Sequence, residues 1–118
     1  MADRRILAID YDETKLQSRS SALKMMSIRV EGARNLRAAL HLLSYDTFDL
    51  ILIAPSVLKS QLHLLLDRIR QSSRTPVVLL YAGEPPANVA ADELVSEADD
   101  LVGIMRAIEH LAPRTTHA

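Results

Sequence analysis

Short apolar runs separated by longer amphipathic stretches dominate the hydrophobic pattern of this chain. Three runs are continuously apolar over four positions, at 6–9, 50–53 and 77–80. Runs of this length, bounded by polar residues or helix breakers, are typical of strands buried on both faces of a sheet. The segment 28–30 alternates between apolar and polar residues and indicates a more exposed strand. A fifth, short strand is predicted at 94–95.

Between these runs, apolar residues recur every three or four positions, which predicts amphipathic helices. We expect one helix over 13–26 and a second one after Asn35, a residue type that caps helix N-termini. A third helix carries a core stripe of apolar residues over 58–69. The last helix covers 101–111, and the two aspartates at 99–100 lie at the positive end of its dipole.

Strand-like and helix-like segments alternate about five times along the chain. This order predicts an α/β fold, with helices on both faces of a doubly wound, five-stranded parallel sheet of the flavodoxin-like type. Only twelve residues, two of them prolines, separate Tyr81 from Leu94. We therefore expect a shortened fourth crossover, formed by a turn or a single helical turn. One domain should cover 1–113, followed by a disordered tail at 114–118.

Composition excludes several classes of function. Among 118 residues, 14 Lys and Arg face 15 Asp and Glu, and this near-neutral balance argues against nucleic-acid and membrane-surface binding. The absence of Cys excludes disulfides and Cys-ligated metals, and the three Gly lie too far apart for a phosphate-binding loop. No apolar run approaches the ~20 residues of a membrane span, and no secretory signal is visible. We expect a cytoplasmic protein.

Polar residues follow the predicted strands at their carboxyl ends, where ligands bind in sheets of this kind. The candidates for such a crevice are Asp10, Tyr11, Asp12, Ser56, Tyr81 and Glu97. They include no nucleophile–base pair and no metal-ligand cluster, so the sequence does not predict an enzyme.

The order of these segments resembles the receiver domain of two-component response regulators over residues 4–111. RRILAIDYDE resembles the first strand of that family and its acidic pair. VEGARNLRAALHLLSYDTFDLILIA follows the frame from the second to the third strand without a gap, and this frame argues against a misaligned phosphorylation site. TPVVLLYA and AADELVSEA resemble the motifs of the fourth and fifth strands. The resemblance implies a receiver-like fold and a role in bacterial signal transduction.

Carried onto this sequence, the phosphorylation site of the family is degenerate. The resemblance places the phosphoacceptor Asp at Ala54, the hydroxyl switch residue at Tyr81 and the fifth-strand Lys at Glu97. A methyl group cannot form an acyl phosphate. A carboxylate in place of the Lys would repel a phosphoryl group by about 4 kcal/mol at ~4 Å and an effective dielectric constant of ~20. We expect no catalytic residue, and no substitute phosphorylation at Ser56 or Asp49.

The metal-binding acids implied by the resemblance are also incomplete. The first acid is present as Asp10, whereas the second falls on Tyr11, with Asp12 adjacent. Two carboxylates are few for Mg²⁺. A weak, vestigial metal site at Asp10 and Asp12 therefore stands beside a second interpretation, in which Asp12 caps the first helix and Asp10 faces solvent. Mg²⁺ is not expected as a cofactor, and no other cofactor is predicted.

The remaining crevice residues have structural as well as functional interpretations. We expect Tyr81 to fill the space that an Asp at position 54 would take. Glu97 is interpreted as an exposed residue at the end of a strand, or as a neighbour of Asp10. Tyr11 is interpreted as a partner contact or a lid over the crevice.

Two hypotheses of function follow. The first is an atypical, phosphorylation-independent receiver domain that acts as a protein–protein interaction module in two-component signalling, with a second copy of the chain among its candidate partners. Its docking surface must differ from that of the family because the fourth crossover is short, although the helix over 101–111 remains available. The second hypothesis is a small-ligand module, which would bind a cationic or hydroxyl-rich molecule through Asp10, Tyr11, Ser56, Tyr81 and Glu97.

Overall fold

The computed structural model describes residues 4–113. The predicted tail at 114–118 therefore lies outside the described residues, as do residues 1–3. Strands and helices alternate until the last crossover, as expected. In chain order the elements are β1 (Arg5–Ile9), α1 (Glu13–Lys24), β2 (Arg29–Ala33), α2 (Leu36–Tyr45), β3 (Leu50–Ile53), α3 (Lys59–Ser72), β4 (Val77–Tyr81), β5 (Glu93–Ser96) and α4 (Asp100–Leu111).

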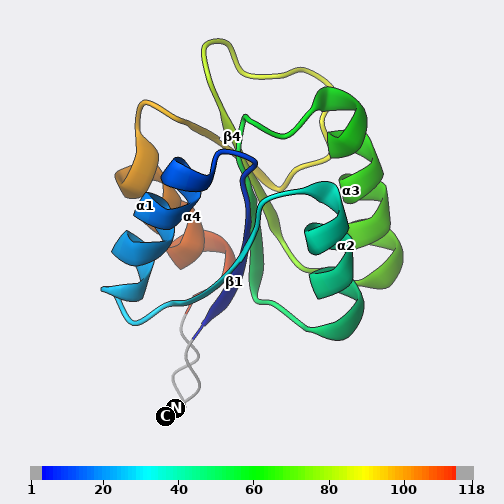
Figure 1. Ribbon diagram of the computed structural model, residues 1–118. Coiled ribbons are helices and arrows are strands. Elements are labelled where there is room, and N and C mark those ends of the chain that lie inside the picture. The colour runs from blue at the N-terminus through cyan, green and yellow to red at the C-terminus, as the bar shows by residue number, and fades with distance from the viewer. Residues whose placement is uncertain (1–3, 114–118) are drawn as a thin grey trace.

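The five strands form one sheet in the order β2-β1-β3-β4-β5, and every neighbouring pair is parallel. Helices α1 and α4 cover one face of this sheet, while α2 and α3 cover the other (Figure 1). The predicted doubly wound, flavodoxin-like architecture is confirmed. Because β1 and β3 are adjacent and parallel, the residues that follow them meet at one edge of the sheet.

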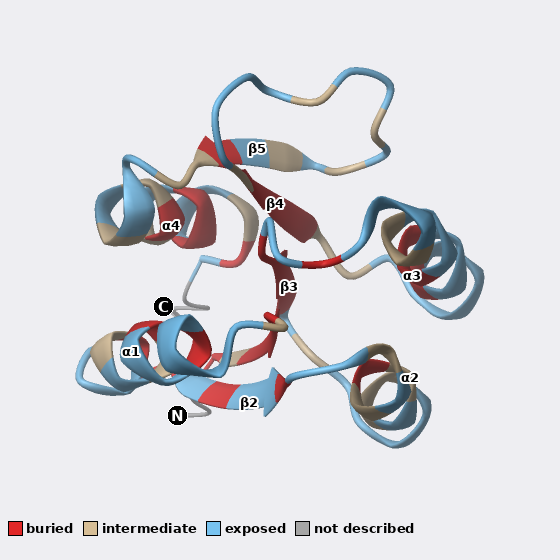
Figure 2. Ribbon diagram, turned by 45° about the horizontal axis from the view of Figure 1, so that its top comes forward, coloured by how far each residue is buried: buried red, intermediate tan, exposed pale blue. Residues whose placement is uncertain are grey.

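Two apolar cores lie on the two faces of the sheet, and alternation along β1 shows how they are separated. Ile6 and Ala8 belong to the core under α1 and α4, whereas Leu7 and Ile9 belong to the core under α2 and α3. All four side chains are buried. Figure 2 shows the same burial along β3 and β4 in the interior of the sheet. Continuous apolar runs were expected to mark strands covered on both faces, and this prediction is confirmed.

The helix starts agree only in part with the sequence pattern. Asp12 and Asn35 cap α1 and α2, accepting hydrogen bonds from the backbone N–H groups of Lys15 and Ala38 at 3.1 and 2.8 Å. The core stripe expected in α3 is wrong at its first position, since Leu58 is 57% exposed. Leu58 has extended backbone angles just before the helix, so its side chain leaves the apolar helix face.

The fourth crossover contains no helix, which confirms that it is shortened. Residues 82–92 instead form an irregular loop (Figure 1). Its end is held by Asp92, whose carboxylate accepts hydrogen bonds from Nη2 of Arg70 at 2.6 Å and from the backbone N–H of Val77 at 2.7 Å. Burial by itself would raise the pKa of Asp92, but these two hydrogen bonds outweigh it and the pKa is lowered.

Close packing of α4 against β5 depends on Gly103. A Cβ atom at this position would lie 2.5 Å from Cγ1 of Val95 and 3.2 Å from Cβ of Asp99. The missing side chain therefore lets the helix backbone approach the strand, as glycine commonly permits. This approach sets the position of α4 beside the carboxyl end of β5.

Candidate functional site

The candidate site lies where β1 and β3 end side by side. Asp10 follows β1 and Ala54 follows β3. The two strand ends are joined, because the N–H of Ala54 donates to the carbonyl of Ile9, the last residue of β1, at 2.9 Å. Both side chains are almost fully buried, with 2% of Asp10 and 3% of Ala54 exposed. The position that the family resemblance assigns to the phosphoacceptor is thus a buried methyl group beside a buried carboxylate.

Asp10 is held by three donors. Its Oδ2 pairs with Nη1 of Arg19 at 2.7 Å. Its Oδ1 accepts from the Ser56 hydroxyl at 2.6 Å and from the backbone N–H of Asp12 at 2.9 Å. The interpretation of Asp10 as a solvent-facing residue is therefore wrong, since its charge is compensated inside the protein.

Arg19 is the functional residue that sequence reasoning missed. It lies on the buried face of α1, between Leu16 and Leu23, and only 8% of it is exposed. Besides Asp10, its guanidinium donates from Nε to Oδ1 of Asp100 at 3.3 Å. The available signal was an arginine at helical spacing between two core leucines, a position that requires a buried partner for the charge.

Glu97 pairs with a second cation from the same helix. Nζ of Lys15 lies 2.9 Å from Oε1 of Glu97, whose side chain is 26% exposed. This hydrogen bond, with the accompanying charge attraction, raises the pKa of Lys15. The exposed fraction shows that the side chain of Glu97 is half-buried. Its backbone N–H donates to the carbonyl of Tyr81 at 2.7 Å. Lys15 and Arg19 lie one turn apart on the same face of α1. This face supplies the cation that pairs with Glu97 and the cation that pairs with Asp10.

Tyr11 and Ser56 complete the crevice on the side of α3. The backbone N–H of Tyr11 donates to Oγ of Ser56 at 2.8 Å, and the Tyr11 hydroxyl donates to the side chain of Gln61. The Tyr11 ring packs against the core under α2 and α3, and burial raises the pKa of its hydroxyl. The structure thus brings Asp10, Tyr11 and Ser56 together, as the sequence predicted for the strand ends.

Tyr81 also lines a separate surface. Its register partner is Ser96, and both belong to a groove of about 620 Å³ between β5 and α4. The other residues around this groove are Glu93, Leu94, Val95, Asp99, Gly103, Arg106, Glu109 and His110. No other member of the predicted crevice set lines this groove. The interpretation of Tyr81 as the group that fills the space beside Ala54 remains a prediction.

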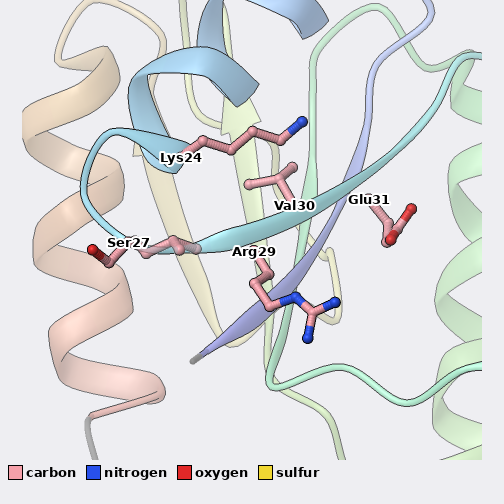
Figure 3. A pocket seen from close by; sticks show the side chains of 6 residues that line it. Lys24, Ser27, Arg29, Val30 and Glu31 are labelled. Carbon is pink, nitrogen blue, oxygen red and sulfur yellow. The ribbon is translucent and has the colours of Figure 1, made fainter. Parts of the chain in front are cut away.

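A second hollow, of about 400 Å³, lies at the turn from α1 into β2. Its charged side chains are Lys24, Arg29 and Glu31. Figure 3 shows that these three side chains point in different directions. This hollow therefore presents no convergent set of polar groups that could select a ligand.

The crevice as arranged does not fit a divalent cation. Both oxygens of Asp10 already accept hydrogen bonds, and Oδ1 of Asp12 is used to cap α1. Within residues 4–113, no group of three or more His, Asp or Glu residues is placed to hold a metal ion. The same part of the chain has no helix that is long and apolar enough to span a membrane.

Comparison with known proteins supports the fold assignment. No family model matches the sequence, and no curated protein matches it. Solved structures do match. A two-component response regulator from Clostridium difficile aligns with a TM-score of 0.83 at 19% identity, covering 98% of this chain and 100% of that chain.

Two further neighbours are similar over nearly their full length. The receiver domain of a sensor histidine kinase from Pseudomonas aeruginosa, with magnesium coordinated in its active site cleft, aligns with a TM-score of 0.81 at 14% identity, covering 93% of this chain and 98% of that chain. The response regulator TrrA from Thermotoga maritima, in complex with Mg²⁺-BeF, aligns with a TM-score of 0.79 at 21% identity, covering 92% of this chain and 98% of that chain. The protein has the fold of response regulator receiver domains.

Proposed function

We propose that this protein is a phosphorylation-independent receiver-like module of two-component signalling, which acts by binding other proteins. The observation that carries the proposal is the buried methyl group of Ala54 at the end of β3. Phosphoryl transfer to a side chain needs an oxygen nucleophile, and Ala54 offers none. The neighbouring hydroxyl of Ser56 donates to Asp10, and that carboxylate is already neutralised by Arg19.

The charges of the crevice support the same proposal. Two of the structural neighbours hold magnesium, one of them together with a beryllofluoride group. In this chain, Arg19 and Lys15 compensate Asp10 and Glu97 instead. Asp10 is held in a buried pair and Glu97 in a more exposed one, so both acids are already paired with a cation of this chain and neither is free to bind the metal ion that accompanies phosphoryl transfer. The module therefore keeps one conformation and carries out no chemistry of its own.

Protein partners would meet a surface that differs from that of a receiver with a full fourth crossover. The crossover at 82–92 contains no helix, and Leu94 of β5, which follows it, is 39% exposed. Val102 of α4 is 68% exposed. We propose that cytoplasmic signalling proteins dock on α4 and β5, and that a homodimer would use the same elements. Apolar side chains next to a polar groove are a common feature of such interfaces.

The alternative of a small-ligand site in the crevice receives less support. A cationic ligand would have to displace Lys15 from Glu97 and Arg19 from Asp10. Breaking the buried pair would leave an uncompensated charge in the core, which is strongly unfavourable. We expect a thermal-shift screen of metabolites to be flat, since a ligand that binds the folded state must raise the melting temperature.

Incubation with acetyl phosphate and Mg²⁺, followed by intact-mass analysis, tests the proposal. We expect no mass gain of one phosphoryl group, while a receiver domain that has an aspartate at the position of Ala54 should gain it under the same conditions. The variant Ala54→Asp restores a carboxylate and serves as the matched control for the missing nucleophile. Stoichiometric phosphorylation of the wild-type chain would overturn the proposal.

A further inference from the structure

Arg19 forms the most buried ion pair of the described residues. In the pair with Asp10, the side chains of Arg19 and Asp10 are 7% and 3% exposed. Arg4 is also buried, but its partner Glu109 is 60% exposed. In every other ion pair within residues 4–113, at least one side chain is a quarter or more exposed.

The guanidinium of Arg19 lies between two carboxylates from distant parts of the chain. Nη1 contacts Oδ2 of Asp10 at 2.7 Å, and Nε contacts Oδ1 of Asp100 at 3.3 Å. Asp10 follows β1 in the middle of the sheet, while Asp100 is the first residue of α4. Asp100 is 59% exposed, whereas Asp10 is 3% exposed, so loss of the cation would leave the Asp10 charge without its compensating partner inside the protein.

The backbone conformation of Asp100 connects this contact with the start of α4. Its φ of 31° lies in the left-handed region, which is unfavourable for a residue with a side chain. The N-cap residue of α4, Asp99, makes no side-chain capping hydrogen bond. The backbone N–H groups of Asp99 and Asp100 donate to the carbonyls of Ser96 and Glu97. Arg19 adds a side-chain contact from a different element, the helix α1.

We infer that the guanidinium of Arg19 occupies the place that a divalent cation would otherwise take between Asp10 and Asp100. From this position it also links the end of β1 to the start of α4. The inference extends the proposed function, because it identifies what keeps the crevice in one state. Arg19 is a positioning residue here: it excludes metal ions by occupying the carboxylates, and it holds α4 through Asp100.

Paramagnetic broadening by Mn²⁺ tests the first half of the inference in the full chain. In the wild type, we expect the amide signals of residues 10–12 and 100 to remain sharp as Mn²⁺ is added. In Arg19→Gln, the same signals should broaden in a saturable manner. The apparent Mn²⁺ affinity should rise at least about tenfold, because a like charge has left the immediate surroundings of the metal ion.

Lys15→Gln is the matched control, since it removes a cation one turn away that does not contact Asp10. We expect no Mn²⁺ broadening at Asp10 in this variant. Saturable broadening at Asp10 in the wild type would overturn the inference, as would an Arg19→Gln variant that folds without gaining a site. A variant that unfolds and is not restored by Mn²⁺ or Mg²⁺ would also contradict it, because a divalent ion then cannot take the place of Arg19.

Arg19→Lys tests the second half. A lysine keeps the positive charge near Asp10 but lacks the planar fork that reaches two carboxylates at once. We expect this variant to fold, to remain without Mn²⁺ broadening, and to show faster hydrogen exchange in the first turns of α4 than the wild type. Wild-type exchange rates there would contradict the tie to α4. These measurements involve no phosphoryl transfer, so their failure is distinguishable from phosphorylation of the wild-type chain.

Discussion

Two regions of the sheet differ from the pattern of the receiver family. One is the crevice at the ends of β1 and β3, and the other is the outer edge formed by β4 and β5. At the crevice, Ala54 and Glu97 stand at positions that the family resemblance assigns to a phosphoacceptor and a lysine. The surrounding charges are compensated internally, by Arg19 on Asp10 and by Lys15 on Glu97. Asp10 and Glu97 at the crevice are therefore both paired with cations of this chain.

At the outer edge, the departure is the loss of a helix, and no other element replaces its cover. Leu94 is 39% exposed, and the groove between β5 and α4 opens to solvent. The loop that leads into β5 is held at its end by the hydrogen bonds of Asp92, and its Val89 and Ala91 pack against the core under α2 and α3. A few side chains can thus pair the charges of a crevice, whereas missing cover over an edge strand leaves apolar surface exposed to solvent.

The largest effect is expected from Asp10→Ala at the crevice. Removing one partner of a buried ion pair should cost about 3–5 kcal/mol of unfolding free energy, because Arg19 keeps its charge in the core. Urea denaturation followed by circular dichroism measures this loss. Glu93→Ala is the matched change at the outer edge, where Glu93 pairs with an exposed His110, and it should cost at most about 1 kcal/mol. Equal losses for the two variants would contradict the comparison.

Gly103→Ala tests the close approach of α4 to β5. The new methyl group would overlap Val95, and overpacking of this kind costs about 1–3 kcal/mol, while alanine in a helix returns up to about 1 kcal/mol. We expect a net loss of stability of about 1 kcal/mol by urea denaturation. Val102→Ala, one position earlier on the exposed face, should change stability little. A stabilised Gly103→Ala variant would show that the contact with Val95 relaxes freely.

Asp92→Asn weakens the anchor of the helix-free crossover. The amide can still accept from Val77 but loses the charge opposite Arg70, so the variant should lose about 1 kcal/mol at pH 7, since the pair is partly exposed. The folded-state pKa of Asp92 is lowered, so its stabilisation is present above the unfolded pKa and is lost as pH falls through the folded value.

The difference in unfolding free energy between wild type and Asp92→Asn should therefore shrink as the pH falls below about 4. Urea denaturation at a series of pH values measures it. A difference that stays constant down to pH 2 would show that the charge of Asp92 does not hold the loop.

The smallest effect is expected from Lys15→Gln. Its pair with Glu97 is largely exposed, so we expect little change in stability near neutral pH, and still less in high salt. Because the pKa of Lys15 is raised in the folded state, any stabilisation is present below the unfolded pKa and disappears as pH rises through the folded value. A loss comparable to that of Asp10→Ala would mean that both crevice pairs contribute equally.

Hydrophobic periodicity was sufficient to predict the five parallel strands, the two-sided cover of the sheet and the short fourth crossover. These features depend on residues that are neighbours in sequence or repeat at a regular spacing, so a local pattern carries them. The place of Ala54 directly after β3 was likewise predictable, since it needs only the end of the apolar run. That this is the position of a phosphoacceptor remains a prediction from the family resemblance. Asp12 and Asn35 were recognisable as caps because a cap bonds to a residue three positions later.

The compensation of the crevice charges was decided only by the tertiary structure. Lys15 meets Glu97 and Arg19 meets Asp100 across 82 and 81 residues of sequence. No local pattern indicates which charged residues the folded chain brings together. The pairing depends on how α1 is rotated on the sheet and on where α4 begins. The exposure of Leu58 has a related cause: its backbone leaves the helix one residue before the apolar stripe turns inward.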